Sequence, residues 1–207
     1  MSIAMRRVVL IGTSGCGKTT LARQLAQRLN VPHIELDALH WQPNWTETPR
    51  DRLVEKARLA LDAADGASDG WTLCGHYGKV ADLTWSRADT VIWLDYSMTV
   101  TFMRVLRRTL LRCWRQEKLW NGNRESLRLQ LFDRDSLFLW VINTWRIRRR
   151  DTPRLLRDPR FAHLRVLRFR SPGQLEQWLA GQAFPENSRQ FPIGQNRLNE
   201  AAQLRPG

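Results

Sequence analysis

Residues 12–19 read Gly-Thr-Ser-Gly-Cys-Gly-Lys-Thr and match the pattern G-x-x-x-x-G-K-[ST] at every fixed position. Residues 8–11, Val-Val-Leu-Ile, are apolar and mostly β-branched, which is typical of a buried strand. Residues 20–29 repeat apolar side chains at the spacing of one helix face. A strand, a glycine-rich loop and a helix in this order are the context in which the pattern binds phosphate. A chance match on a glycine-rich turn is the alternative, and both flanks disfavour it. The stretch therefore predicts a nucleotide site.

The residues of this loop have separate expected roles. Its glycines let the backbone curl so that N–H groups point at phosphate oxygens, and the start of the following helix adds a positive dipole. We expect Lys18 to reach the β- and γ-phosphates of ATP and the Thr19 hydroxyl to bind Mg²⁺. The predicted nucleotide-binding residues are Gly12, Thr13, Ser14, Gly15, Cys16, Gly17, Lys18, Thr19 and Thr20.

Length and composition are those of a globular protein. A chain of 207 residues with 43% apolar residues is long enough for one domain with a large core. No apolar run approaches the roughly 20 residues that span a bilayer. Removal of the first residues as a leader would destroy the first strand, so we expect a cytoplasmic protein. The three cysteines form no C-x-x-C pair, which disfavours a disulfide framework and a zinc site.

The positive charge is concentrated in one segment. The net charge is +13, and residues 101–170 contain 19 Lys and Arg against 6 Asp and Glu, so this segment carries the whole excess. Such a segment can bind nucleic acid or a membrane surface. Arginines can also fork onto the phosphates of a bound nucleotide, and a solvated helix face is a third possibility.

Strands and helices alternate along the chain. Further strands are predicted at residues 33–36, 71–74, 90–94 and 164–168. Helices are predicted from about 48, over 99–114, over 136–150 and after 172. This alternation predicts a three-layer α/β fold in which helices cover both faces of a five-stranded parallel sheet. Ligands of such sheets bind at the carboxyl ends of the strands, an edge that collects residues 12–19, Asp37, residues 74–77 and Asp95.

The chain is expected to form one domain and a tail. Residues 1–180 are predicted as the domain, with the polar segment at about 116–135 as a lid that contains the turn signal Asn-Gly-Asn. Residues 181–207 are polar and contain prolines, which is typical of a flexible tail.

Several segments together resemble the topology modulation proteins, bacterial P-loop proteins that are similar to adenylate kinase and shikimate kinase. The most specific segment is L-D-x-x-x-W-x-P-x-W at residues 36–45. The resemblance covers roughly residues 5–180, also through Gly75-x-Tyr77, residues 88–95 and the arginines near 104–108 and 146–154. It implies a nucleotide-kinase-like fold with strand order 2-3-1-4-5, ATP in the loop and a helical, arginine-rich lid.

The chain departs from this family after the third strand. The family usually has Asp-Gly-Asn-Tyr where this chain has Cys74-Gly75-His76-Tyr77. The Asp would normally orient the Mg²⁺ shell. Shikimate-kinase-like proteins place a carboxylate at the end of the second strand, near Mg²⁺ and the acceptor hydroxyl, and Asp37 stands there. The resemblance thus implies Asp37 as a metal-associated residue together with Thr19.

Candidate catalytic residues each have a structural alternative. Asp37 can accept the proton of an acceptor hydroxyl, or it can cap the following helix. Arg104, Arg108 and Arg112 share a helix face and can clamp the transferred phosphate, or they can form a solvated face. A second group of candidate phosphate-binding residues is Arg146, Arg149, Arg150 and Arg154.

Aromatic residues and histidines form a candidate acceptor pocket. His40, Trp41 and Trp45 can line this pocket, or they can form a packed cluster. His76 can contact the acceptor, or it can be a structural loop histidine.

Two functions agree with these features. The first is a phosphotransferase that moves the γ-phosphate of ATP to a nucleotide, nucleoside or hydroxylated metabolite, with catalytic residues Lys18, Asp37, Arg104, Arg108 and Arg112. The second is an ATP-binding regulator of DNA topology that touches DNA through its arginines. The second is disfavoured because no helix-turn-helix or similar module is evident.

Overall fold

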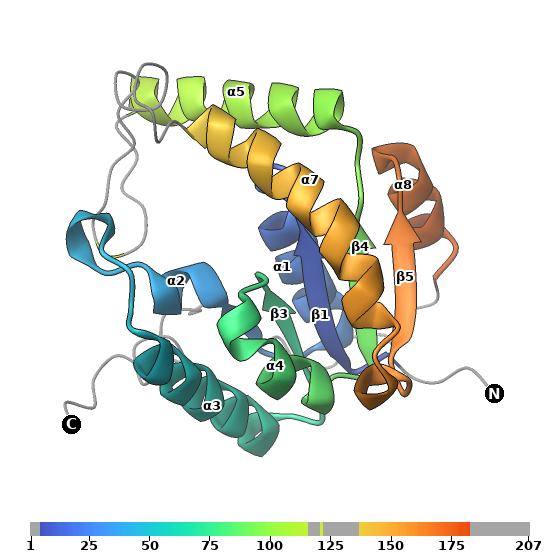
Figure 1. Ribbon diagram of the computed structural model, residues 1–207. Helices are drawn as coiled ribbons and strands as arrows, with labels where there is room; N and C mark the ends of the chain where they lie inside the picture. Colours follow the sequence, from blue (N-terminus) through green and yellow to red (C-terminus); the bar gives the residue numbers. More distant parts are fainter. Residues whose placement is uncertain (1–4, 116–120, 122–136, 183–207) are drawn as a thin grey trace.

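Five parallel strands form the central sheet of the computed structural model, which describes residues 5–115, 121 and 137–182 (Figure 1). The sheet order is β2-β3-β1-β4-β5, which confirms the predicted order. Continuous apolar runs occupy the central strands because parallel sheets are buried on both faces. The strands are β1 (Arg7–Gly12), β2 (His33–Glu35), β3 (Trp71–Cys74), β4 (Thr90–Leu94) and β5 (Arg165–Phe169).

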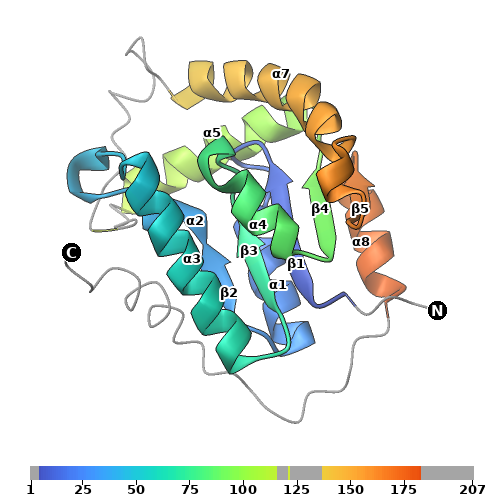
Figure 2. The ribbon, with the colours of Figure 1, turned by 60° about the horizontal axis from the view of Figure 1, so that its bottom comes forward.

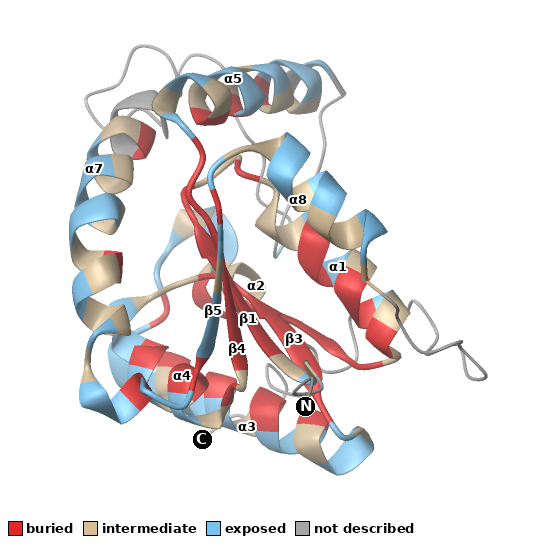
Figure 3. Ribbon diagram, turned by 90° about the vertical axis from the view of Figure 1, so that its right-hand side faces the viewer, coloured by how far each residue is buried: buried red, intermediate tan, exposed pale blue. Residues whose placement is uncertain are grey.

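Helices cover both faces of this sheet, which confirms the predicted three-layer fold (Figures 2 and 3). One core lies between the sheet and the helices α3 (Arg50–Ala67) and α4 (Ala81–Arg87). The opposite core lies under α1 (Lys18–Leu29) and α8 (Pro172–Ala180). Successive side chains of a strand point to opposite faces of the sheet, so Leu73 lies in the first core and Cys74 in the second.

Three elements lie around the carboxyl ends of the strands. The short helix α2 (Leu36–His40) follows β2 directly. Helix α5 (Met98–Arg115) crosses beyond the strand tips, and α7 (Leu137–Leu156) descends beside it toward β5 (Figure 1). These elements bring side chains to the edge of the sheet where a ligand is expected.

Several helices and strands begin or end at other residues than predicted, because tertiary packing buries residues beyond the local sequence pattern. The second strand ends at Glu35, because Leu36 already belongs to α2. Helix α4 is not among the predicted helices, and it buries Trp85 completely. Helix α7 continues through Pro153 to Leu156, since Thr152 is buried and the following leucines pack on the core.

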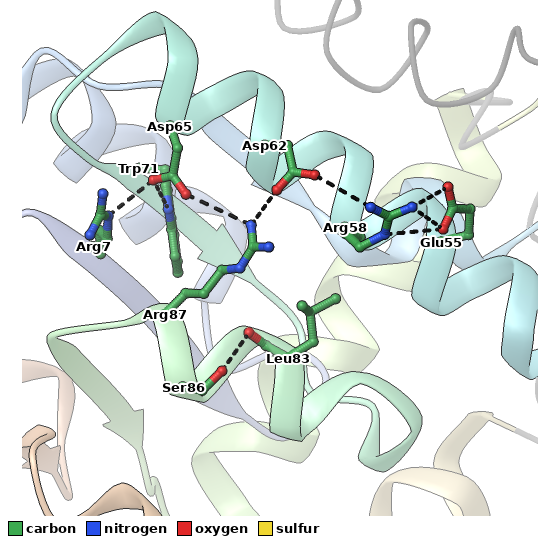
Figure 4. A network of polar contacts seen from close by, with 9 residues as sticks. All are labelled: Arg7, Glu55, Arg58, Asp62, Asp65, Trp71, Leu83, Ser86 and Arg87. Atoms are coloured by element: carbon green, nitrogen blue, oxygen red, sulfur yellow. Dashed lines mark hydrogen bonds and ion pairs between the residues drawn. The ribbon is translucent and has the colours of Figure 1, made fainter.

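A polar network at the amino ends of the strands joins α3 and α4 to the sheet (Figure 4). The Asp65 carboxylate accepts hydrogen bonds from Arg7 Nε at 3.0 Å and from the Trp71 indole nitrogen at 3.2 Å. Arg87 of α4 reaches Asp62 at 2.5 Å and Asp65 at 3.8 Å. Because Arg7 and Trp71 begin β1 and β3, this network lies at the opposite end of the sheet from residues 12–19.

Two predicted segments fall largely outside the described residues. The predicted lid at 116–135 is described only at Asn121, whose side-chain amide donates to the Trp41 carbonyl at 2.5 Å. The predicted tail is described only at residues 181 and 182. Among the helices that the structure describes, none combines the length and the apolar character needed to cross a membrane.

Candidate functional site

Residues 12–19 lie at the carboxyl edge of the sheet, with the ends of the other strands around them. Strand pairing places Gly12 opposite Leu94, and it places Cys74 between Leu10 and Glu35. The loop, the end of β2 and the end of β3 are therefore neighbours, as expected for a binding edge of a parallel sheet.

The loop backbone is packed tightly against β4 and α5. Gly12 has φ +147°, and a Cβ there would lie 2.7 Å from the Leu94 carbonyl oxygen. Gly15 has φ +81°, and a Cβ there would lie 2.4 Å from Val105 Cγ2 of α5. Both positions require glycine, because side chains rarely adopt these φ values and have no room.

Lys18 begins α1 and lies over the loop that precedes it. Its Nζ donates to the Thr13 carbonyl oxygen at 3.0 Å and lies 4.0 Å from Cys16 Sγ. The ammonium group is thus held at the loop by a main-chain oxygen, where a phosphate oxygen can replace that partner.

The Thr19 hydroxyl meets a buried carboxylate that the sequence analysis did not nominate. Thr19 Oγ1 donates to Glu35 Oε1 at 3.0 Å, and Arg23 Nη2 donates to the other oxygen at 3.2 Å. Thr19 and Arg23 lie one helical turn apart on α1, so both reach the same end of β2. The sequence signal for Glu35 is its place inside a predicted buried strand. A buried carboxylate needs hydrogen-bond or ion-pair partners, here Thr19 and Arg23.

Cys74 occupies the position of the acid that is usual in the resembled family. Its Sγ lies 3.4 Å from Thr19 Oγ1. Burial, followed by the charges of Glu35 and Asp37, raises the pKa of the Cys74 thiol. Because Thr19 gives its only hydroxyl proton to Glu35, the Cys74 thiol donates to Thr19.

Asp37 lies in the first turn of α2 and contacts a different group. The Tyr77 hydroxyl donates to Asp37 Oδ1. Burial, followed by the Asp37 charge and this hydrogen bond, raises the pKa of Tyr77, so the phenol stays protonated. The structure therefore brings Glu35 to Thr19 and pairs Asp37 with Tyr77. The metal role of Asp37 stays a prediction.

Arginines from two helices converge on the loop. From α5, Arg104 Nη1 donates to the Cys16 carbonyl at 3.3 Å, and Arg108 Nη2 donates to Ser14 Oγ at 3.2 Å. From α7, Arg148 Nη1 donates to the Gly12 carbonyl at 2.6 Å. Guanidinium groups on loop oxygens are placed to bind a phosphate held by the same loop.

Arg148 was not among the nominated arginines. It continues the apolar face of α7 that carries Val141 and Trp145, and that spacing was the signal for an inward side chain. Burial lowers the pKa of Arg148 below its usual value, but an arginine keeps its charge in proteins.

The other nominated arginines occupy different places. Arg112 lies one turn beyond Arg108 on α5. Arg149 binds Asp95, while Arg150 and Arg154 reach the half-exposed Asp151. Arg146 is exposed on α7.

An aromatic cluster flanks the Asp37 side of the site. The His40 ring centroid lies 4.3 Å from that of Tyr77 and 4.9 Å from that of Trp41, and Trp41 lies 5.6 Å from Trp45. His40 is buried in this cluster. The predicted acceptor-pocket residues are therefore packed together and joined to Asp37 through Tyr77.

His76 lies near two cations of the site. Its ring packs at 5.5 Å from Trp85. Burial, followed by the charges of Arg148 and Lys18, lowers the pKa of His76 to about 4, so the imidazole is neutral at pH 7.

Comparison with known proteins identifies one family and several similar proteins. The family described as AAA domain (AAA_18) matches residues 8–130. The shikimate kinase of Enterococcus faecalis is 52% identical over 33 residues, which are 16% of this chain and 20% of that protein. The chain thus matches about a fifth of the length of this curated relative.

The chain is also similar to solved structures over most of its length. Shikimate kinase from Acinetobacter baumannii, in complex with shikimate, has 13% identity and a TM-score of 0.45, over 86% of this chain and 96% of that one. A protein from Chloroflexus aurantiacus has 16% identity and a TM-score of 0.47, over 87% of this chain and 100% of that one. The family match contains the loop, Glu35, Asp37 and α5, and it ends before Arg148.

Proposed function

The chain belongs to the AAA domain family, and on that premise we propose that it is a phosphotransferase that moves the γ-phosphate of ATP to a small-molecule acceptor. The acceptor class is a nucleotide, a nucleoside or a hydroxylated metabolite. One observation carries the proposal: Lys18, Arg104, Arg108 and Arg148 all donate to oxygens of residues 13–16 or Gly12. Four cations on one phosphate loop suit a transition state whose charge spreads over phosphoryl oxygens.

The oxygen donors near the loop fit Mg²⁺. This ion prefers oxygen ligands, keeps several waters and takes few protein carboxylates. The Thr19 hydroxyl and the Glu35 carboxylate lie 3.0 Å apart and supply such donors. In the proposed site Thr19 binds the ion, Glu35 orients its shell, and Asp37 is a further candidate at the acceptor side. When bound, Mg²⁺ neutralises charge on the phosphates.

The acceptor is expected between the loop and the aromatic cluster. Asp37 accepts the proton of its hydroxyl, and the Tyr77 hydrogen bond holds the Asp37 carboxylate in place. Lys18 and the arginines exchange loop oxygens for phosphate oxygens, which requires small side-chain movements. The protein thus contributes position and charge, since phosphoryl transfer needs little covalent chemistry from it.

The alternative of an ATP-binding DNA regulator has less support from the arginines. Arg104, Arg108 and Arg148 donate to oxygens of the loop, so their guanidinium groups are directed at the loop and not at a DNA surface. Of the exposed arginines on α7, Arg150 and Arg154 share the carboxylate of Asp151, which reduces the charge they offer to DNA.

The test is ADP formation by the purified chain with MgATP and a panel of acceptors. We expect one acceptor class to stimulate ADP release, and we expect Lys18→Ala to abolish the stimulation. Lys56→Ala on α3 is the matched control and should behave as wild type. The absence of acceptor-dependent ADP, at the same background rate in wild type and Lys18→Ala, would sink the proposal.

A further inference from the structure

We propose that Asp95 is a positioning residue that holds Arg148 of α7 against the phosphate loop. The inference rests on the proposed function, because it assumes that the loop binds phosphate. Asp95 follows β4 directly, and its main-chain N–H donates to the Phe169 carbonyl at 2.9 Å. Its position is therefore set by the sheet and not by a loop.

The Asp95 carboxylate is buried and binds two arginines from different elements. Arg149 of α7 approaches with Nε at 2.9 Å from Oδ1 and Nη2 at 3.3 Å from Oδ2, a two-point contact. Arg168 of β5 donates to Oδ2 from Nε at 3.0 Å and from Nη2 at 2.5 Å. Two-point contacts of this kind fix orientation as well as distance. Only 4% of Asp95 is exposed, so screening by water is weak on its side of the contact.

The residue after Asp95 adds a second attachment for the same helix. The Trp145 indole nitrogen donates to the Tyr96 carbonyl at 3.0 Å, and the Arg149 guanidinium lies 4.7 Å from the Trp145 ring centroid. Trp145 and Arg149 are one turn apart on α7, so both attachments hold the same face of the helix. The Tyr96 ring in turn lies 5.4 Å from the guanidinium carbon of Arg104, the α5 residue that reaches the loop.

Arg148 depends on this attachment because it is next to Arg149 in the sequence. Its own polar contact in the described part of the chain is the hydrogen bond to the Gly12 carbonyl, at 2.6 Å. No described carboxylate forms an ion pair with it. Arg148 is partly buried, and a guanidinium with one main-chain partner moves when its helix moves. Asp95 therefore controls where Arg148 stands, although it does not face the ligand.

The test compares dissociation constants of the full chain for MgATP by calorimetry. Asp95→Asn removes the charge and preserves the shape, and we expect the constant to rise about tenfold, as for the loss of a charge-assisted hydrogen bond. In the Arg148→Met background the same substitution should change the constant less than about twofold, because non-additivity marks residues that act together.

Arg168→Gln is the matched control. It removes the other partner of the same carboxylate but leaves the contact between Asp95 and α7, so the constant should stay close to wild type. Urea unfolding verifies that each variant folds. Should Asp95→Asn fail to fold, Arg149→Gln removes the same attachment from a side chain that is 40% exposed.

The outcomes distinguish the positioning role of Asp95 from the proposed phosphotransferase function. A full effect of Asp95→Asn in the Arg148→Met background, or an equal effect of Arg168→Gln, would overturn the positioning role and leave the proposed function intact. Tight MgATP binding without turnover on any acceptor would contradict the proposed function alone. A wild-type chain that does not bind MgATP would contradict both.

Discussion

Thr19 has one hydroxyl proton, and the direction of that proton organises the candidate metal site. Thr19 donates it to Glu35, so a lone pair of the hydroxyl accepts from the Cys74 thiol. A thiol stands at position 74, where the resembled family has its aspartate, and the Glu35 carboxylate accepts the Thr19 hydrogen bond. We therefore infer that Glu35 carries the charge beside the metal position.

Substitution of Glu35 tests that inference at the scale of one residue. Glu35→Gln keeps an acceptor for Thr19 but removes the negative charge. The Mg²⁺ concentration for half-maximal ATP binding should rise about tenfold or more, as for other residues that orient a metal shell. Glu47→Gln, at an exposed carboxylate, is the control. An unchanged Mg²⁺ dependence in Glu35→Gln would show that another residue supports the ion.

The pair of Asp37 and Tyr77 makes a second prediction at this scale. Asp37→Asn removes the proposed base, and kcat should fall about 100-fold, within the usual range for such groups. Tyr77→Phe keeps Asp37 but removes its hydrogen bond, so kcat should fall by a smaller factor. Tyr96→Phe retains the ring that faces Arg104 and serves as the control. Equal rates for Asp37→Asn and wild type would exclude Asp37 as the base.

Among the elements, α5 decides the shape of the phosphate loop. Thr101, Val105 and Thr109 repeat along its buried face, and Val105 packs against Gly15. The same helix carries Arg104 and Arg108 to loop oxygens. A wedge between the loop and α5 should therefore disturb both this packing and the contacts of Arg104 and Arg108.

Gly15→Ala provides that wedge. The new Cβ would meet Val105 Cγ2 at 2.4 Å, and the φ of +81° strains any side chain. We expect a loss of about 1–2 kcal/mol in the free energy of unfolding from the φ strain alone, together with weaker MgATP binding. Adding Val105→Ala should relieve the contact and restore part of the binding.

Gly66→Ala is the control for this prediction. Nothing lies within 4 Å of a Cβ at Gly66, which is inside α3. Alanine should stabilise that helix by about 0.5–1 kcal/mol. Binding by Gly15→Ala that matches wild type would show that the loop does not depend on its packing against α5.

At the scale of the whole molecule, a buried histidine makes stability depend on pH. Thr72 donates to the Ala22 carbonyl at 3.1 Å, so it accepts from His33 Nδ1, also at 3.1 Å. Burial, followed by the Arg23 charge, lowers the pKa of His33 to about 4, from 6.5 in the unfolded chain. The folded chain therefore contains the neutral imidazole, which links β2 to β3 through Thr72 and, through the Thr72 hydroxyl, to α1.

The sign of the pH effect follows from linkage. Below pH 6.5 the unfolded chain binds a proton that the folded chain refuses, so stability falls as pH decreases from 6.5 toward about 4. The contribution of His33 is about 3 kcal/mol over that range. Urea unfolding at pH 7.5, 6, 5 and 4 measures it. Because the pKa of His76 is also lowered to about 4, His33→Gln should remove about half of the pH dependence. His163→Gln, at an exposed site, should leave it unchanged. Parallel curves for His33→Gln and wild type would contradict the prediction.

The fold was predictable because its signals are local. Apolar runs identified strands such as β1 and β4, the loop pattern identified the first strand, and the family resemblance supplied the strand order. Helix ends were less predictable. Helix α4 and the last turns of α7 form because Trp85 and Thr152 are buried against other elements. The local sequence does not indicate this burial.

The site was predictable only in part. Arg104 and Arg108 lie on the loop as their helix face suggested, but Arg148 and Glu35 were not nominated. Glu35 and Asp37 are two residues apart, and the chain changes from strand to helix between them. That change sends Glu35 toward α1 and leaves Asp37 at Tyr77.

The sequence by itself determined the strand, glycine loop and helix of residues 8–29 and the parallel α/β class, because glycine conformation and apolar spacing act between near neighbours. Only the tertiary structure decided which carboxylate meets Thr19 and which arginines meet the loop. The physical reason is that these contacts join elements far apart in the chain. Asp95 reaches Arg149 across 54 residues, and only the packing of α7 on the sheet determines that it does.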